Sequence, residues 1–180
     1  MRALIVLLFC SALLAEAEER IPGEAPVSSP GGTFRITQRL DDSWHTTIHF
    51  KKPGVRSIVL ADDYSWAGRF FVSPNDQWLL YIQKDASGSN TSFLFRVEPT
   101  GRIWRMEQPF GAAAFTFLED AHGVSTAHLY HTGIDFIGWD MAAGALRFSI
   151  HASSNQYEQA GVNEQLIYDL RKDAFRRSKP

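Results

Sequence analysis

Residues 71–81 read Phe-Val-Ser-Pro-Asn-Asp-Gln-Trp-Leu-Leu-Tyr, and this stretch decides the fold. Its Ser-Pro-Asn-Asp centre combines proline with residues that tolerate turn conformations, so it predicts a tight turn. The turn leads into Trp78-Leu79-Leu80-Tyr81-Ile82, which is apolar at every position. Such a run predicts a strand that is covered on both faces. The stretch therefore indicates a β-sheet in the interior of the protein.

The chain on either side shows the same alternation of short apolar segments and turn residues. Lys52-Pro53-Gly54 and Glu98-Pro99-Thr100-Gly101 are turns of similar chemistry. No long window holds a helical stripe, so we expect an all-β fold built as an antiparallel meander. The expected strands are Thr33–Leu40, Trp44–Phe50, Val55–Ala61, Arg69–Val72, Gln77–Gln83, Thr91–Glu98, Arg102–Glu107, Ala113–Leu118, Thr126–His131, Ala145–His151 and Glu164–Arg171.

An approximate internal repeat runs through the chain with a spacing of about 70 residues. Residues 72–81 align with residues 139–148, and residues 93–97 align with residues 166–170. Each copy consists of a turn, an apolar strand, a polar loop and a second strand. The repeat predicts a single all-β domain with two approximate units. The domain and its units are expected at residues 33–176, about 33–107 and about 108–176.

The stretch 71–81, followed by Phe93-Leu94-Phe95-Arg96-Val97, resembles a known blade motif. It is similar to the F-S-P-D-G-x-x-L-A-Y pattern of secreted β-propellers related to the TolB type, a WD40-like repeat, with Asn75-Asp76-Gln77 in place of the Asp-Gly. The resemblance implies propeller-like blades. A closed ring typically takes four to eight blades of about 40 residues. Because residues 33–176 have room for three or four at most, we expect an open or sandwich-like array rather than a closed ring.

The N-terminal residues 1–17 carry the features of a secretory signal peptide. Met1-Arg2 is a positive start, the run that follows is apolar, and Ala15-Glu16-Ala17 matches an A-x-A cleavage site. We expect cleavage after Ala17 and export to the periplasm or the medium. The only cysteine, Cys10, lies in the apolar run, and Phe9 before it does not fit a lipidation site. The mature chain is therefore expected to contain no disulfide and no lipid anchor.

The two ends of the mature chain differ in composition from the domain. Residues 18–32 are rich in proline, glycine and small residues, which predicts a flexible leader. Residues 177–180 form a basic tail. The formal net charge is −2, and both signs are spread along the chain. Because a basic stripe is missing and no apolar run is long enough to span a bilayer, we expect neither nucleic-acid binding nor a membrane span.

The common catalytic and metal-binding motifs are missing from the sequence. There is no G-x-S-x-G nucleophile elbow and no H-E-x-x-H pattern. His45 and His49 lie about 13 Å apart if they share one strand, which is too far for one ion. The acidic pairs Asp62-Asp63 and Glu119-Asp120 have the composition of ordinary turns. We therefore expect no catalytic residue, no metal and no cofactor.

The aromatic residues are the most unusual feature of the composition, with five tryptophans and thirteen phenylalanines. Trp78 and Trp104 lie in apolar segments and are expected in the core. A second group follows a polar turn, so its aromatic members are candidates for an exposed contact with a sugar or a protein. The alternative is a loop folded over the edge of the core. The candidate ligand-binding residues are Asp62, Asp63, Tyr64 and Trp66.

Three functions are compatible with these features. The leading hypothesis is an exported, non-enzymatic binding or scaffold protein for a protein or glycan ligand. An alternative is an envelope hydrolase that acts on glycan, and a further alternative is a periplasmic inhibitor or immunity-type protein. Two carboxylates about 5–10 Å apart in one pocket would favour the hydrolase. A convex, loop-borne aromatic patch would favour the inhibitor.

Overall fold

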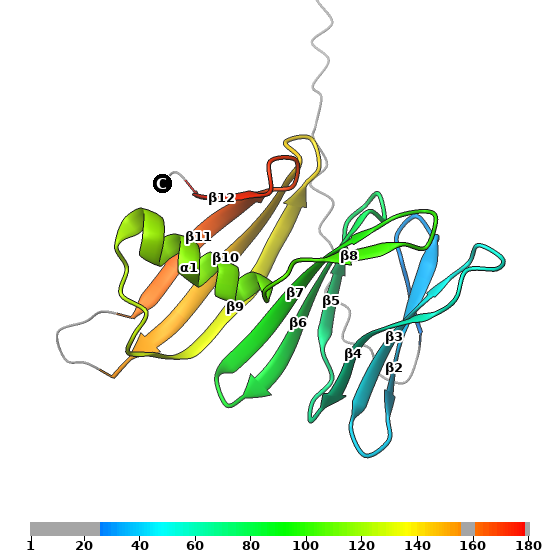
Figure 1. Cartoon of the computed structure of the whole chain (residues 1–180), viewed down its shortest axis with the longest axis horizontal. Helices are drawn as coiled ribbons and strands as arrows, with labels where there is room; N and C mark the ends of the chain where they lie inside the picture. Colours follow the sequence, from blue (N-terminus) through cyan, green and yellow to red (C-terminus); the bar gives the residue numbers. More distant parts are fainter. Residues whose placement is uncertain (1–25, 156–160, 179–180) are drawn as a thin grey trace, which may run out of the picture.

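The chain folds into three four-stranded antiparallel sheets and one helix (Figure 1). A computed structural model describes residues 26–155 and 161–178. The fold is all-β, as expected, and none of the sheets closes into a barrel. None of the helices formed by the described residues is long and apolar enough to cross a membrane. The predicted signal peptide, residues 1–17, lies outside the described residues.

The sheets follow one another along the chain. Sheet I contains β1 (Val27–Ser28), β2 (Phe34–Leu40), β3 (Trp44–Phe50) and β4 (Ile58–Tyr64). Sheet II contains β5 (Arg69–Val72), β6 (Trp78–Ala86), β7 (Ser89–Val97) and β8 (Ile103–Arg105). Sheet III contains β9 (Leu129–Asp140), β10 (Ala145–Ser154), β11 (Val162–Asp169) and β12 (Ala174–Arg177). In each sheet the strands pair in chain order, as in a meander of propeller-like blades.

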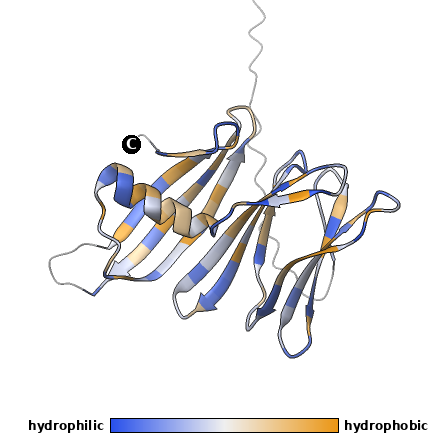
Figure 2. Ribbon diagram, viewed as in Figure 1, coloured by the Kyte–Doolittle hydropathy of each residue, from blue (hydrophilic) through white to orange (hydrophobic). Residues whose placement is uncertain are grey.

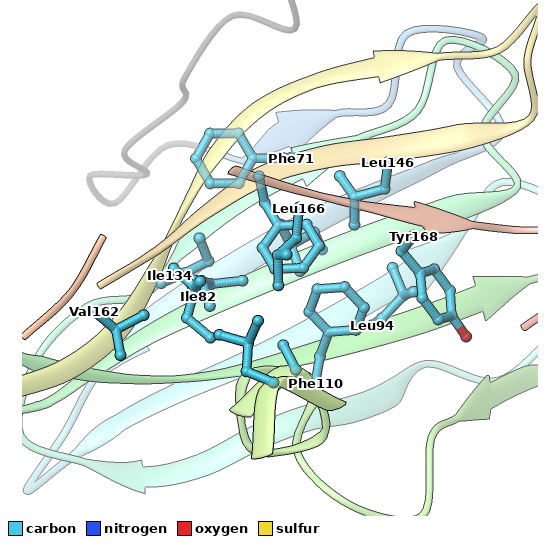
Figure 3. Packing of buried hydrophobic residues seen from close by; sticks show 14 of the residues in the cluster. Phe71, Ile82, Leu94, Phe110, Ile134, Leu146, Val162, Leu166 and Tyr168 are labelled. Carbon is cyan, nitrogen blue, oxygen red and sulfur yellow. The ribbon is translucent and has the colours of Figure 1, made fainter. Parts of the chain in front are cut away.

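Sheet II lies between the other two sheets and is buried on both faces. Along β6, Leu79 and Tyr81 belong to the core shared with sheet I. Leu80 and Ile82 belong to the core shared with sheet III (Figure 3). This alternation confirms that the apolar run Trp78–Ile82 forms a strand covered on two sides.

Polar and apolar residues follow one another along the strands of sheets I and III (Figure 2). Ile36 and Phe148 point into the two cores, and their neighbours in the strands therefore point outward. Alternation of this kind is typical of strands with one face packed on a core and the other facing water. The outward residues include Arg35, Thr37, His45 and His49 on sheet I and Arg147, Ser149, His151 and Gln165 on sheet III.

The predicted strand Ala113–Leu118 is wrong, because this segment belongs to helix α1 (Phe110–His122). Its buried residues are Phe110, Ala113, Ala114 and Leu118, three and four positions apart, which is the stripe of a helix packed on one face. Gly123 ends the helix in the left-handed conformation, with φ 66°, and its N–H bonds to the Glu119 carbonyl. The helix packs between sheets II and III and completes their shared core.

Other predicted features also shift in the structure. The strand expected at Thr126–His131 is the 12-residue strand β9, which continues to Asp140. Trp104 was expected in the core but is 54% exposed, because β8 is an edge strand. Of the predicted leader, residues 26–32 are described, and Val27 pairs with Ile36 in sheet I. At the other end, Arg177 of the predicted tail closes β12 and bonds to Glu164.

Asp76, in the β5–β6 turn, fastens the start of sheet I to sheet II. Its carboxylate is 5% exposed and accepts hydrogen bonds from Ser29 Oγ at 2.7 Å, Gly31 N at 2.8 Å, and Thr33 N and Oγ1 at 3.1 and 2.7 Å. Asp76 has φ 57°, the left-handed conformation that the motif's glycine would adopt. Burial alone would raise its pKa, but the donors on Ser29, Gly31 and Thr33 outweigh burial and lower it.

Candidate binding site

The four predicted site residues lie at the end of β4 and in the connection to β5. Asp62, Asp63 and Tyr64 are the last three residues of β4, and Trp66 follows two residues later. Asp62 pairs with the His45 imidazole on β3. Asp63 has φ 64°, and its N–H bonds to the Asp62 carboxylate at 3.0 Å. Both carboxylates therefore remain at the surface, and the contacts of Asp62 with His45 and with the Asp63 N–H hold the end of β4 in its conformation.

Tyr64 and Trp66 have different surroundings. Tyr64 is half-buried, lies opposite Trp44 and packs against the core between sheets I and II. Burial, followed by the nearby Asp85 charge, raises the pKa of its phenol. Trp66 is 42% exposed. The structure therefore leaves one of the two predicted aromatic contacts at the surface.

A hydrogen bond from a buried side chain fixes the backbone of Trp66. Gln83 is fully buried, and its amide donates to the Trp66 carbonyl at 2.8 Å. Tyr81 in turn donates its hydroxyl proton to Gln83. Burial raises the pKa of Tyr81 to about 12, so this phenol keeps its proton at neutral pH. On the outside, Lys84 Nζ lies 4.9 Å from the centre of the Trp66 ring.

An open pocket of about 510 Å³ lies beside this segment, where the edge strands β5 of sheet II and β9 of sheet III approach each other. Arg69 and Lys84 of sheet II and Asp135 and His151 of sheet III line it, together with Ala67 of the β4–β5 connection. A second pocket of about 500 Å³ shares the two sheet III residues. None of these lining residues was predicted, because no motif links strands that meet only through the stacking of the sheets.

The polar centre of the pocket is Asp135. Its Oδ1 lies 3.2 Å from Arg69 Nη2, and its Oδ2 lies 3.2 Å from His151 Nδ1. Arg69 and His151 are each about one-third exposed, so water reaches the cluster and its ion pairs contribute little to stability. An external anion can compete for the same donors.

The side chains of Ser43, His45 and Asp62 have the order of a hydrolytic triad. His45 Nδ1 faces Asp62, and His45 Nε2 lies 3.5 Å from Ser43 Oγ. The Asp62 side chain is 59% exposed, whereas the acid of such a triad is normally buried. The long Ser43 contact and the exposed acid make this a surface hydrogen-bond chain that joins two strand ends.

One described pocket, of about 350 Å³, contains two carboxylates, Asp76 and Glu98. Four donors already occupy Asp76. Glu98 accepts from Trp104 Nε1 and Thr100 Oγ1, each at 3.1 Å. A carboxyl group with a lowered pKa is a poor general acid at neutral pH. The arrangement therefore serves packing better than glycan cleavage.

In residues 26–155 and 161–178, no three His, Cys, Asp or Glu side chains lie close enough together to hold a metal ion. His49 is instead held between Thr37 Oγ1 and Ser57 Oγ, each 2.8 Å from one ring nitrogen. Burial, followed by the Arg35 charge, lowers the pKa of His49 and favours its neutral form.

Comparisons with known proteins do not identify a family for this chain. No protein family and no curated protein sequence matches the chain. Among solved structures, TolB from Acinetobacter baumannii is similar with a TM-score of 0.40 and 12% sequence identity. The match covers 85% of this chain and 31% of the TolB chain, so this chain spans about a third of that protein's length. A likeness of this size carries no argument about function, and the propeller-like description rests on the three sheets themselves.

Proposed function

We propose that this chain is an exported, non-enzymatic binding protein that contacts a protein or glycan ligand through the segment Asp62–Trp66. Its signal-peptide sequence supports export. Trp66 is the central contact residue, with Lys84 and the neighbouring pocket at its side.

One observation carries the proposal: Trp66 has a fixed backbone and an exposed ring. A tryptophan whose main chain is held by the buried Gln83 loses little conformational freedom when a ligand covers it. Tryptophan is also the residue type most enriched among the energetic centres of protein interfaces. A rigid, partly exposed indole beside polar and charged groups is therefore suited to binding.

The matched control for Trp66 is Trp104. Both rings are exposed, by 42% and 54%, and both lie near a cation, since Arg102 Cζ is 5.4 Å from the Trp104 ring centre. The two positions differ in their cations: Lys84, beside Trp66, lines the open pocket described above, whereas Arg102, beside Trp104 on β8, does not. Replacing either ring by alanine removes the same side chain, so the comparison separates position from chemistry.

We expect Trp66→Ala to lower affinity for the natural ligand by about 30-fold, equivalent to about 2 kcal/mol, and Trp104→Ala to leave it unchanged. Immobilised wild type and both variants are offered the same envelope extract and, separately, purified peptidoglycan. Mass spectrometry then identifies the material retained by wild type and Trp104→Ala but lost from Trp66→Ala. Urea unfolding of both variants should remain within about 0.5 kcal/mol of wild type.

Two results would reject the proposal. Equal retention by all three proteins would remove Trp66 from the contact. Release of soluble fragments from peptidoglycan by the wild type would establish turnover and favour the glycan hydrolase. The double variant lacking Tyr64 as well is the poorer test, because Tyr64 packs against the core and its loss is expected to destabilise the fold.

A further inference from the structure

The pocket beside Trp66 carries a local excess of positive charge in a chain whose formal net charge is −2. Arg69 and Lys84 contribute two cations to its lining, and Asp135 contributes one carboxylate. His151 adds a third positive charge when it is protonated. The lining therefore favours an anionic ligand over a neutral or cationic one.

Of the two cations that line the pocket, Arg69 forms an ion pair with Asp135, whereas Lys84 forms none with the described residues. Within the part of the chain that the structure describes, its ammonium group has no carboxylate in ion-pair range, and its recorded contact is with the Trp66 ring at 4.9 Å. An ammonium group over an indole is attracted to the ring but keeps its hydrogen-bonding protons. Lys84 is thus ready to donate to an incoming anion next to Trp66.

Asn90, which pairs with Lys84 across β6 and β7, is held in place by sheet III. The Asn90 amide bonds to both the carbonyl and the N–H of Ile134, at 3.2 and 3.1 Å, and so joins sheet II to sheet III. Gly133 makes room for it: a Cβ there would lie 2.3 Å from Asn90 Nδ2 and 2.8 Å from His151 Nε2. A binding surface fixed before the ligand arrives loses less entropy on binding.

The backbone positions of Arg69 and Lys84 are spaced at a distance that an extended acidic segment can match. Arg69 pairs with Ile82 across β5 and β6, and Lys84 follows Ile82 by two positions on the same strand. Arg69 and Lys84 are therefore diagonal neighbours on one face of sheet II, about 7–8 Å apart at the backbone. Side chains two positions apart in an extended peptide are separated by about 6.6–6.8 Å. The spacing matches two acidic residues with one residue between them.

We infer that this pocket binds an acidic, extended segment of a protein partner, in which carboxylates at alternate positions meet Lys84 and Arg69. A carboxylate already fits the site, since Asp135 bridges Arg69 and His151. The inference deepens the proposed binding function, because it assigns the partner class at the site that Trp66 borders.

The test uses two peptides of one composition, Glu-Thr-Glu-Thr-Glu-Thr and Glu-Glu-Thr-Thr-Glu-Thr, both labelled with a fluorophore at the N-terminus and amidated; the second has no two glutamates with one residue between them. We expect the alternating peptide to bind more tightly, with an affinity that falls as ionic strength rises. Lys84→Gln should weaken it about tenfold. Arg102→Gln is the matched control, because it neutralises another cation that lies near an exposed tryptophan, and it should change nothing. Fluorescence anisotropy of the labelled peptides measures all four affinities.

Equal affinity for the two peptides, or an alternating peptide unaffected by Lys84→Gln, would overturn the inference. So would inorganic phosphate that displaces the peptide at equal concentration, since the site would then recognise any small oxyanion. A failure of the proposed function can be told apart from a failure of this inference. Peptide binding that survives Trp66→Ala but is lost in Lys84→Gln supports the acidic segment and removes Trp66 from the contact.

Discussion

Replacing Phe110 with alanine is expected to lower the free energy of unfolding by about 3–5 kcal/mol. Phe110 is fully buried at the start of α1, and its ring centre lies 5.0, 5.2 and 5.3 Å from those of Phe148, Tyr168 and Phe175. The substitution would leave a cavity where the helix meets three strands of sheet III. Equilibrium unfolding in urea, followed by circular dichroism, measures the loss.

Phe115→Ala is the control for Phe110→Ala. Phe115 lies in the same helix but is only half-buried, so the same substitution removes less buried surface there. We expect it to lose less than half as much stability. A loss below about 1 kcal/mol for Phe110→Ala would mean that α1 is not part of the core between sheets II and III.

The second large effect is expected at Asp76. Asp76→Asn keeps the side-chain size and a residue that tolerates the left-handed conformation. The variant has one oxygen where the wild type has two, so either the Gly31 N–H or the donors on Ser29 and Thr33 face an NH2 group instead of an acceptor. We expect a loss of about 2–4 kcal/mol at pH 7, because buried unpaired donors keep their full desolvation penalty. Urea unfolding at several pH values measures it.

The pH dependence of this effect has a defined sign. The folded-state pKa of Asp76 lies below the ordinary aspartate value of 3.8, so its stabilisation is fully present above that value. It is lost as the pH falls through the folded-state pKa. The difference between wild type and Asp76→Asn should therefore be constant from pH 7 to pH 5 and shrink below pH 3.8.

The control is Asp63→Asn, the same substitution at an exposed residue with φ 64°. It should change stability by less than about 0.5 kcal/mol at every pH. Equal losses at the two positions would show that the left-handed backbone, rather than the buried carboxylate, is the common cause.

The strands that carry the strongest local pattern could be predicted from the sequence. The run Trp78–Ile82 has no polar position, and the structure covers it on both faces. Helix α1 was not predicted, because Phe115 and Phe117 are spaced two positions apart as in a strand, whereas the residues that the helix buries are spaced three and four positions apart. Tertiary packing against sheet III decided between them. Trp104 was misplaced for a related reason: an edge strand and a central strand differ in their neighbours, not in their own residues.

The candidate site was also predictable from the sequence only in part. A polar turn followed by two aromatics is visible in the sequence, and the structure leaves Trp66 exposed while it packs Tyr64. The pocket beside it is not visible, because Arg69 and Asp135 are 66 positions apart and meet only through the stacking of sheets II and III. Long-range contacts of this kind have no local signature in a single sequence.

The five tryptophan indole N–H signals in a ¹H–¹⁵N NMR spectrum test most directly whether Trp66 is the contact residue. Each signal is assigned by a single Trp→Phe variant, and the protein is titrated with the envelope-derived ligand that the wild type retains. We expect the Trp66 signal to shift with saturation, while the signal of Trp104, whose Nε1 donates to Glu98, stays in place. An unchanged Trp66 signal in the presence of bound ligand would contradict the proposed site.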